Sequence, residues 1–224
     1  MKKIVIFSLF LLFFSFVYAE KLIIVSVKNP DENSVDNKDY LLIKECFEKM
    51  KIDVKFEYYP WQRCIELIEN KKADAIFSLK KTPERESFLL YPDEEIRNSE
   101  WFFFYKKGKN IVYNSLNDLK GYRIAATTGY AYGDEFWKNR DIIIDEGYDD
   151  IVNMKKIDND RVDFFLCNKE DGEKIINDLK IADIIKTEKY YSKYPLYLAF
   201  SKKEKNIEIA KKFSKTLKKI KQRM

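Results

Sequence analysis

The chain has 224 residues, of which 46% are hydrophobic and 35% charged, and its 42 basic and 37 acidic residues give a formal net charge of +5. Charges so evenly balanced and interspersed do not form the basic patch of a nucleic-acid-binding protein, so no nucleic-acid partner is expected. The sequence has no histidine and no pair of cysteines at metal-ligand spacing, so neither a metal centre nor another cofactor is expected.

The N-terminus has the pattern of a secretory signal peptide. Met1 to Lys3 is basic, Ile4 to Val17 is apolar except for two serines, and Ala19 ends a small-residue cleavage site. A membrane anchor is the alternative, but the apolar run is shorter than the roughly 20 residues that span a bilayer. We therefore expect residues 1–19 to be removed and the mature protein to lie in a Gram-negative periplasm.

The first half of the mature chain alternates between strand and helix patterns. Apolar and β-branched runs predict strands, and apolar residues spaced three and four apart predict helices. In chain order these are a strand over Leu22 to Val27, a helix over Tyr40 to Met50, a strand over Ile52 to Tyr58, a helix opened by Pro60 and a strand over Ala73 to Leu79. This order favours a parallel α/β sheet with right-handed crossovers.

A second α/β unit follows a strand that leaves the first one. The predicted elements are strands over Trp101 to Tyr105 and Tyr122 to Ala126, a helix over Tyr130 to Asn139, a strand over Ile142 to Ile144, a helix over Tyr148 to Lys156, a strand over Arg161 to Cys167 and a helix over Glu170 to Leu179. We expect a two-lobed α/β fold, with lobe 1 in residues 20–106, lobe 2 in 107–189, and a return to lobe 1 in 190–224.

The return begins with a strand over Tyr194 to Lys202 and ends in a basic amphipathic helix, about Lys203 to Gln222. Such a helix could lie on a membrane surface. We favour the alternative, in which its apolar face covers lobe 1 and its lysines face solvent.

Cys46, Cys64 and Cys167 each lie among apolar residues. Buried small hydrophobic residues are therefore the favoured interpretation of all three. A Cys46–Cys64 disulfide is the alternative, and an odd number of cysteines leaves at least one free thiol.

Polar residues follow the predicted strands where an α/β sheet binds ligands, at the carboxyl ends of its strands. These stretches are Lys28 onward, Ser78 to Arg85, Thr127 to Tyr132, and Asn168. Arg85 is the strongest candidate, because a guanidinium offers paired donors that match a carboxylate. A surface ion pair with Glu84 or Glu86 is its alternative role.

Two further features of these stretches suggest ligand contacts. Thr127 to Tyr130 precedes a predicted helix, whose free N–H groups could hold an anion or could simply be capped. Trp61, Tyr130 and Tyr132 could form aromatic walls, although each could equally belong to the core.

Several motifs in the same order resemble the bacterial extracellular solute-binding proteins of family 3. They are Pro60-Trp61-Gln62-Arg63, Ala73 to Ile76, Thr82-Pro83-Glu84-Arg85, Phe88 to Pro92, Asp118 to Ile124, Gly129 to Tyr132, Arg161 to Phe164 and Leu198 to Lys202. The Pro-Trp-x-Arg element resembles a compact branch of that family. The resemblance implies two lobes on a two-strand hinge that close over a small polar or anionic solute, and a monomer that delivers this solute to an ABC-type permease.

The resemblance also implies roles for single residues. Arg85 matches the arginine that grips a ligand carboxylate, and Ser78 and Thr82 match polar positions in the same loop. Lys80 stands where a hydroxyl residue is usual, and Asn168 stands where an aspartate pairs with the ligand ammonium.

Two more departures affect the same site. Tyr130 and Ala131 replace the common Thr-Thr after Gly129, which leaves backbone donors there. The first strand ends in Lys28 to Asp31 without the usual aromatic residue. Together with Lys80 and Asn168, these departures predict a ligand more anionic than an ordinary amino acid, such as a dicarboxylate or an acidic amino acid.

Two other functions remain open at this point. One is a periplasmic enzyme on the same scaffold, similar to a dehydratase, in which glutamate or lysine would have to replace histidine as the general base. The other is a ligand sensor that acts through a separate membrane partner.

Overall fold

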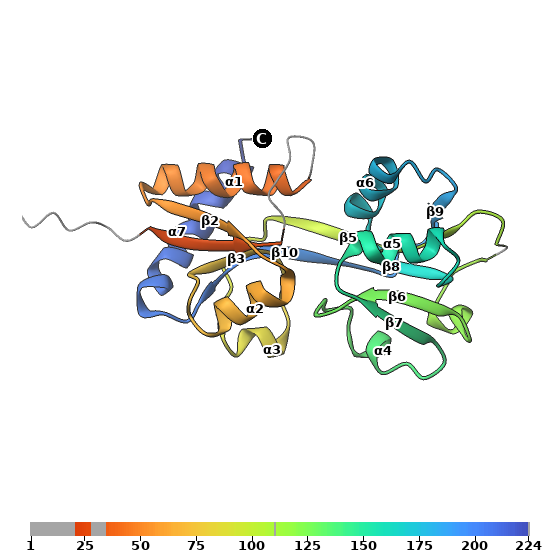
Figure 1. The fold of residues 1–224 in the computed structure, drawn as a ribbon. Coiled ribbons are helices and arrows are strands. Elements are labelled where there is room, and N and C mark those ends of the chain that lie inside the picture. Colours follow the sequence, from red (N-terminus) through yellow and green to blue (C-terminus); the bar gives the residue numbers. More distant parts are fainter. Residues whose placement is uncertain (1–20, 28–34, 110, 224) are drawn as a thin grey trace, which may run out of the picture.

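The computed structural model describes residues 21–27, 35–109 and 111–223. The predicted signal peptide and the segment Lys28 to Asp31 lie outside these residues. One mixed sheet runs through the molecule in the order β2-β1-β3-β10-β5-β8-β6-β7, with β4 paired to β10 and β9 paired to β5. Helices cover both faces of this sheet at each of its two ends (Figure 1).

Lobe 1 is built on three parallel strands, β1 (Leu22–Ser26), β2 (Val54–Tyr58) and β3 (Ala75–Lys80). One face of the sheet packs on α1 (Val35–Met50) and α7 (Glu204–Lys221), in a core that includes Phe47, Phe77 and Phe213. The other face packs on α2 (Trp61–Glu69). The short α3 (Pro83–Glu86) and β4 (Leu89–Leu90) follow β3. The terminal basic helix thus covers lobe 1, as favoured above.

Lobe 2 repeats this plan around β6 (Arg123–Thr127), β7 (Ile143–Gly147) and β8 (Phe164–Asn168), which are parallel to one another. Its helices are α5 (Asp150–Asp158), α6 (Lys169–Leu179) and the four-residue α4 (Asp134–Trp137), with a 3₁₀ turn η1 over Leu116–Leu119 and a short strand β9 (Ile184–Lys186). Two cores flank the sheet, one rich in phenylalanine and tyrosine and the other in phenylalanine and isoleucine.

Two ten-residue strands join the lobes, β5 (Arg97–Lys106) and β10 (Ser192–Ser201). They pair antiparallel with each other, while β10 also pairs with β3 of lobe 1 and β5 also pairs with β8 of lobe 2. The predicted two-lobed α/β fold with a two-strand hinge is therefore confirmed (Figure 1).

The helix predicted over Tyr130 to Asn139 is wrong, because only Asp134–Trp137 is helical. Gly133 has φ +103° and stands at the start of this short helix, so the chain cannot continue a helix backwards through it. The Tyr132 hydroxyl accepts the Thr127 N–H at 2.9 Å, and the Tyr130 N–H donates to the Thr127 carbonyl at 3.1 Å. The Thr128 N–H donates to the Gly147 carbonyl at 3.0 Å, so the amides of Thr127, Thr128 and Tyr130, which were predicted to hold an anion at a helix start, are bonded within the protein.

The three cysteines are all buried, and none is in a disulfide. Burial raises the pKa of Cys46 to about 12 and that of Cys64 to about 11. The alternative of a Cys46–Cys64 bridge is therefore not what the structure contains.

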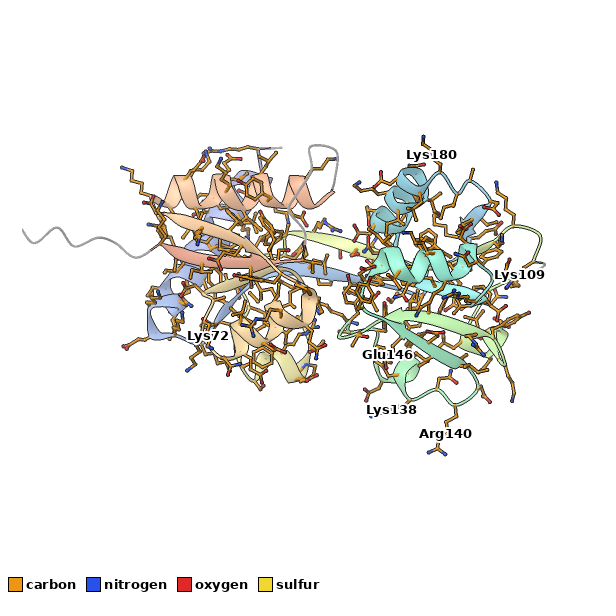
Figure 2. The ribbon with its side chains drawn as sticks, in the orientation of Figure 1. Lys72, Lys109, Lys138, Arg140, Glu146 and Lys180 are labelled. Atoms are coloured by element: carbon orange, nitrogen blue, oxygen red, sulfur yellow. The ribbon has the colours of Figure 1, made fainter. Side chains whose placement is uncertain are left out.

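The described parts of the chain contain neither a helix long and apolar enough to cross a membrane nor a cluster of three potential metal-ligating side chains. Charged side chains such as Lys72 on lobe 1 and Lys138 and Lys180 on lobe 2 point outwards into solvent (Figure 2).

Candidate functional site

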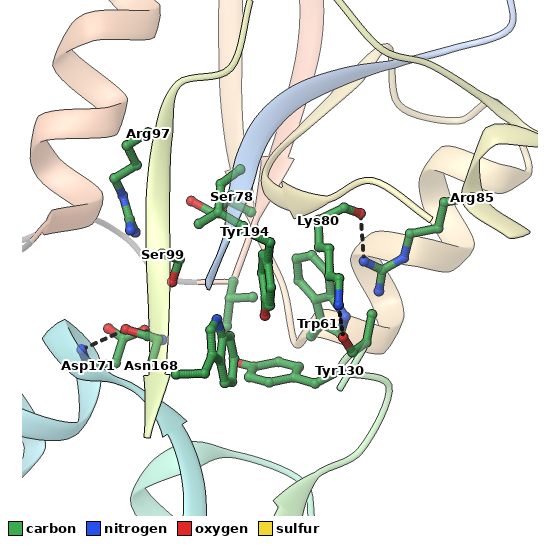
Figure 3. Close-up of a pocket in the computed structure, with 15 residues that line it drawn as sticks. Trp61, Ser78, Lys80, Arg85, Arg97, Ser99, Tyr130, Asn168, Asp171 and Tyr194 are labelled. Carbon is green, nitrogen blue, oxygen red and sulfur yellow. Dashed lines mark hydrogen bonds between the residues drawn. The ribbon is translucent and has the colours of Figure 1, made fainter. Parts of the chain in front are cut away.

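A cavity of about 80 Å³ lies where the two lobes and both hinge strands meet (Figure 3). Its polar lining comes from three sources. Lobe 1 contributes Trp61, Ser78, Lys80 and Arg85, lobe 2 contributes Tyr130, Asn168 and Asp171, and the hinge strands contribute Arg97, Ser99, Trp101 and Tyr194. We call this space the deep cavity. A wider groove outside it runs between α2 and α3 of lobe 1 and the 128–137 segment of lobe 2.

Ser78 reaches the deep cavity because β3 bulges at this point. In the pairing of β3 with β10, Leu79 lies opposite Tyr197 and Ile76 lies opposite Ala199. Between these two pairs β3 has two residues and β10 has one, so β3 carries one extra residue. Ser78 has φ +61°, a conformation that is uncommon outside glycine and that accompanies many functional sites. A bulge of this kind re-aims a side chain, and the Ser78 hydroxyl lies 3.4 Å from an oxygen of Asp39.

Asp39 of α1 is buried and pairs with Arg97 of β5, whose Nε lies 3.0 Å from Oδ2 and 3.2 Å from Oδ1. Burial raises the pKa of Asp39, and Arg97 partly offsets this by favouring the ionised carboxyl. The pair fixes the base of the Arg97 guanidinium group at the edge of the deep cavity. Arg97 did not stand out in the sequence, because nothing in its neighbourhood distinguishes it from a surface arginine.

Arg85 is held in place by the turn that precedes it. The Thr82 side chain caps α3 by accepting the Arg85 N–H at 3.2 Å. The guanidinium group is buried, and it donates to the carbonyls of Lys80 at 3.1 Å and Gly129 at 3.3 Å. Its carbon lies 5.5 Å from the centre of the Trp61 ring, and burial lowers its pKa.

The alternative role of Arg85 in a surface ion pair is not supported, because the side chain is only 8% exposed and points into the cleft. Glu86 pairs instead with Lys81, at 2.8 Å.

Lys80 lies beside Arg85 and is half-buried. Its ammonium group donates to the Ala131 carbonyl at 3.1 Å and lies 4.2 Å from the centre of the Tyr194 ring. Burial lowers the pKa of Lys80, and the nearby Arg85 charge lowers it further. Two cations therefore stand side by side in a place that water reaches poorly.

Three hydrogen bonds from these side chains join the lobes. Trp61 Nε1 donates to the Gly129 carbonyl at 3.0 Å, Arg85 donates to the same oxygen, and Lys80 donates to the carbonyl of Ala131. We call these three bonds the latch. A Cβ atom on Gly129 would lie 3.3 Å from the Trp61 ring, so the lobes approach closely here. The latch separates the deep cavity from the wider groove outside.

Asn168, on the lobe 2 side, serves as the N-cap of α6. Its Oδ1 accepts the Asp171 N–H at 2.9 Å and its Nδ2 donates to Asp171 Oδ2 at 2.7 Å. The Asp171 carboxylate also lines the deep cavity. A carboxylate thus stands one helical turn from the neutral Asn168. Asp171 does not stand out in the sequence, because an acidic residue in the first turn of a helix is common.

The remaining predicted site residues fall in different places. Tyr130 lies between the indole rings of Trp61 and Trp101, at 5.9 and 5.8 Å between ring centres. Thr82 and Gly129 line the outer groove rather than the deep cavity. Tyr132 is buried in the core of lobe 2, where its ring packs on Phe136 and Trp137, so it forms no wall of the cavity.

The charges of the deep cavity are unequal. Lys80, Arg85 and Arg97 are cationic, Asp171 is anionic, and the buried Asp39 behind Arg97 belongs to an ion pair. This leaves an excess of positive charge between two α/β lobes joined by paired strands. The arrangement suits a small solute with an anionic group.

The model of the bacterial extracellular solute-binding proteins, family 3, matches residues 30–223. The chain belongs to this family. No curated protein matches the sequence.

Solved structures agree with the fold of this solute-binding protein. The holo form of ArgBP from T. maritima superposes with a TM-score of 0.76 at 17% identity, over 90% of each chain. The amino acid ABC transporter substrate-binding protein AbpA from Streptococcus pneumoniae, bound to L-arginine, gives 0.74 at 16% identity over 90% of this chain and 89% of that one. A histidine kinase sensor domain with similarity to periplasmic binding proteins gives 0.76 at 14% identity over 90% of each chain. At these identities the likeness establishes the shared fold.

Proposed function

We propose that this solute-binding protein captures a small carboxylate-bearing solute, an amino acid or a related acid, and presents it to an ABC-type permease from the periplasm. The observation that carries the proposal is the adjacent pair of cations, the buried Arg85 and the half-buried Lys80, beside the latch that joins the lobes. A carboxylate can accept from a guanidinium group through two parallel bonds, which a carbonyl oxygen cannot do. A bound carboxylate would therefore replace the Gly129 carbonyl as the partner of Arg85.

Hinge closure supplies the mechanism. The lobes are connected by only two strands, so they can separate while each keeps its own core. A solute that contacts Arg85 of lobe 1 and Asp171 of lobe 2 together has its full set of contacts only when the lobes are closed. Such a ligand shifts the population towards the closed state by its difference in affinity for the two states.

Asp171 widens the class of ligand that was expected from the sequence. A neutral Asn168 favoured a solute more anionic than an amino acid, whereas Asp171 restores a carboxylate that an ammonium group could contact. Both acidic amino acids and dicarboxylates therefore belong in the first screen. Tight binding of lysine or arginine with no binding of anionic solutes would contradict the proposal.

A thermal-shift screen of amino acids and small carboxylates against the mature protein tests it. A ligand at about 100 times its Kd stabilises a protein by about 2.7 kcal/mol. For a chain of this size that corresponds to a rise in Tm of roughly 5 to 10 °C. Hits should then be incubated with the protein and recovered unchanged, because turnover would favour the enzyme alternative.

A sensor that acts through a separate membrane partner is the second candidate, and the likeness to a histidine kinase sensor domain favours keeping it. The two roles differ in what the closed form binds. An importer should show ligand-dependent ATP hydrolysis when this protein is added to its permease, whereas a sensor should change the activity of a kinase or a similar output protein.

A further inference from the structure

Two buried hydrogen-bond donors on the hinge strand β5 have no partner. Ser99 is 1% exposed and Trp101 is 6% exposed, and neither the Ser99 hydroxyl nor Trp101 Nε1 makes a hydrogen bond within the described structure. Buried polar groups in native proteins are nearly always paired, and each exception needs an explanation. Both side chains line the deep cavity, so a molecule in that cavity is the natural partner.

The two donors lie on one face of the strand together with Arg97. Residues 97, 99 and 101 alternate with residues that turn away, because successive side chains of a strand point to opposite faces. Glu100, on the opposite face, pairs with Lys193 near the surface. β5 therefore presents a guanidinium group, a hydroxyl and an indole N–H in a row to one cavity, and we call these three residues the β5 row.

The β5 row lies on a different wall from Arg85 and Lys80. Figure 3 shows Arg97 and Ser99 on one side of the cavity, near Asn168 and Asp171, and Lys80 and Arg85 on the other side. Tyr194 stands between the two sets. A compact ligand with two oxygen-bearing groups can place one on each wall.

We propose that the β5 row binds a second oxygen acceptor of the ligand, a carboxylate or carboxamide oxygen at the end of a short chain. This deepens the proposed function and rests on it, because the first carboxylate is assigned to Arg85 and Lys80. The ligand class is then a short amino acid with an acid or amide side chain, or a dicarboxylate. The small volume of the cavity, about 80 Å³, favours a compact solute over a long one.

The experiment compares ligands that differ only in the second acceptor. Calorimetry is run with L-glutamate and L-glutamine against L-norvaline, with L-aspartate and L-asparagine against L-2-aminobutanoate, and with succinate against butanoate. In the wild-type protein at least one acceptor-bearing ligand should bind tenfold or more tightly than its truncated analogue. The carboxylate and carboxamide arms show which oxygen group is preferred.

Two conservative variants test whether the preference for a second oxygen acceptor comes from the β5 row. Ser99→Ala and Trp101→Phe each remove one donor and keep most of the side-chain volume. Each should weaken the acceptor-bearing ligand about tenfold, as expected for the loss of one hydrogen bond, and should leave the truncated analogue unchanged. If the preference stays the same in both variants, or if the truncated analogues bind as tightly to the wild-type protein, the inference is wrong.

The thermal stability of the free protein tests the unpaired Ser99 hydroxyl without any ligand, so the test holds even if a variant binds poorly for other reasons. Ser99→Ala removes an unpaired hydroxyl, so the Tm of the free protein should stay the same or rise. Ser214→Ala is the matched control, because the hydroxyl of this buried serine accepts the Glu94 N–H at 3.1 Å far from the cavity. It should lower the Tm and leave binding unchanged. If Ser99→Ala lowers the Tm as much as the control does, the Ser99 hydroxyl has a partner in the free protein and the inference loses its basis.

These outcomes separate the inference from the proposed function. If truncated monocarboxylates bind and depend on Arg85, the proposed function stands while the β5 row is rejected. If no carboxylate binds the wild-type protein, both are rejected.

Discussion

Arg85 illustrates how one side chain can serve both states of a receptor. Its guanidinium group donates to carbonyls of Lys80 and Gly129, and the face of Trp61 covers it. A buried cation held only by neutral carbonyls is incompletely compensated, because charged groups in an interior need a charge or several hydrogen bonds. A carboxylate in the cavity would supply the missing charge, so we expect Arg85 to contribute more to binding than to stability.

The variant Arg85→Lys tests this expectation. Lysine keeps the positive charge and loses the planar fork, so carboxylate affinity should fall about tenfold to hundredfold, the range for one or two charge-assisted bonds. Calorimetry measures the loss. Arg63→Lys is the control, because Arg63 is exposed on α2 and pairs with Glu66 at 3.0 Å. Equal effects of the two variants would remove Arg85 from the site.

Lys80 predicts a pH dependence of binding. Burial and the charge of Arg85 lower the pKa of Lys80 in the free protein, whereas a bound anion raises it. Binding therefore takes up a proton at pH values above the free-protein pKa, and affinity should fall as the pH rises through it, by up to about tenfold per pH unit. Below that pKa the ammonium group is already charged and the dependence disappears.

Calorimetry over a series of alkaline pH values, in buffers of different ionisation enthalpy, measures this proton uptake. Lys80→Met should bind more weakly at neutral pH and lose the alkaline slope. An unchanged slope in Lys80→Met would assign the titration to another group.

At the residue scale, the sequence allowed part of the site to be predicted. Trp61, Ser78, Lys80, Arg85, Tyr130 and Asn168 all line the deep cavity, because the ends of parallel strands meet at one edge of a sheet. Ser99 was missed because it lies in the polar segment Arg97 to Glu100, before the predicted strand, and Trp101 was missed because it opens a continuous apolar run. Nothing in such a run shows which alternate residues face a cavity and which face a core.

The turn after β6 shows the same limit at the scale of elements. Tyr130 to Asn139 has helical spacing, yet the positive φ angles of Gly129 and Gly133 and the packing of Tyr132 into the core leave only one helical turn. Tertiary contacts thus decided a conformation that local propensity left open. The result is a loop whose Gly129 and Ala131 carbonyls accept hydrogen bonds from lobe 1.

Gly129→Ala tests the role of this loop in closure, and Gly121→Ala is a matched control. Both glycines have φ near +80°, so alanine should destabilise each by about 1 kcal/mol. Only at Gly129 would the added Cβ meet a neighbour, at 3.3 Å from Trp61, whereas nothing lies within 4 Å at Gly121. Gly129→Ala should therefore also weaken ligand binding, and Gly121→Ala should not.

Denaturant unfolding and calorimetry on the two variants separate these effects. If both variants bind the ligand like the wild-type protein, the close approach at Gly129 has no role in closure.

At the scale of the whole molecule, the two-lobed fold could be predicted from the sequence, because the order of strands and helices in each half is a local pattern. The relative position of the lobes could not, because it depends on the latch between residues almost 70 positions apart, such as Trp61 and Gly129. Among the residues that the structure describes, three hydrogen bonds and one aromatic contact with Tyr130 are a small set of interactions to hold two lobes together. We therefore expect the closed form of the free protein to exchange with an open one.

Trp61→Phe should shift that exchange towards the open form. Phenylalanine keeps an aromatic ring beside Arg85 and Tyr130 but loses the bond from Nε1 to Gly129, which is worth about 1 kcal/mol. A smaller closed population lowers the apparent affinity in proportion, so we expect ligand binding to weaken about fivefold. Small-angle scattering should show a larger radius of gyration for the free variant and equal radii for both proteins at saturating ligand.

Trp137→Phe controls for the loss of an indole N–H. Trp137 donates to the Tyr130 carbonyl at 3.2 Å, and this hydrogen bond lies within lobe 2 and does not connect the two lobes. It should leave the radius of gyration of the free protein unchanged. If Trp61→Phe also leaves the radius and the affinity unchanged, the latch does not hold the lobes together, and closure must then depend on the solute itself.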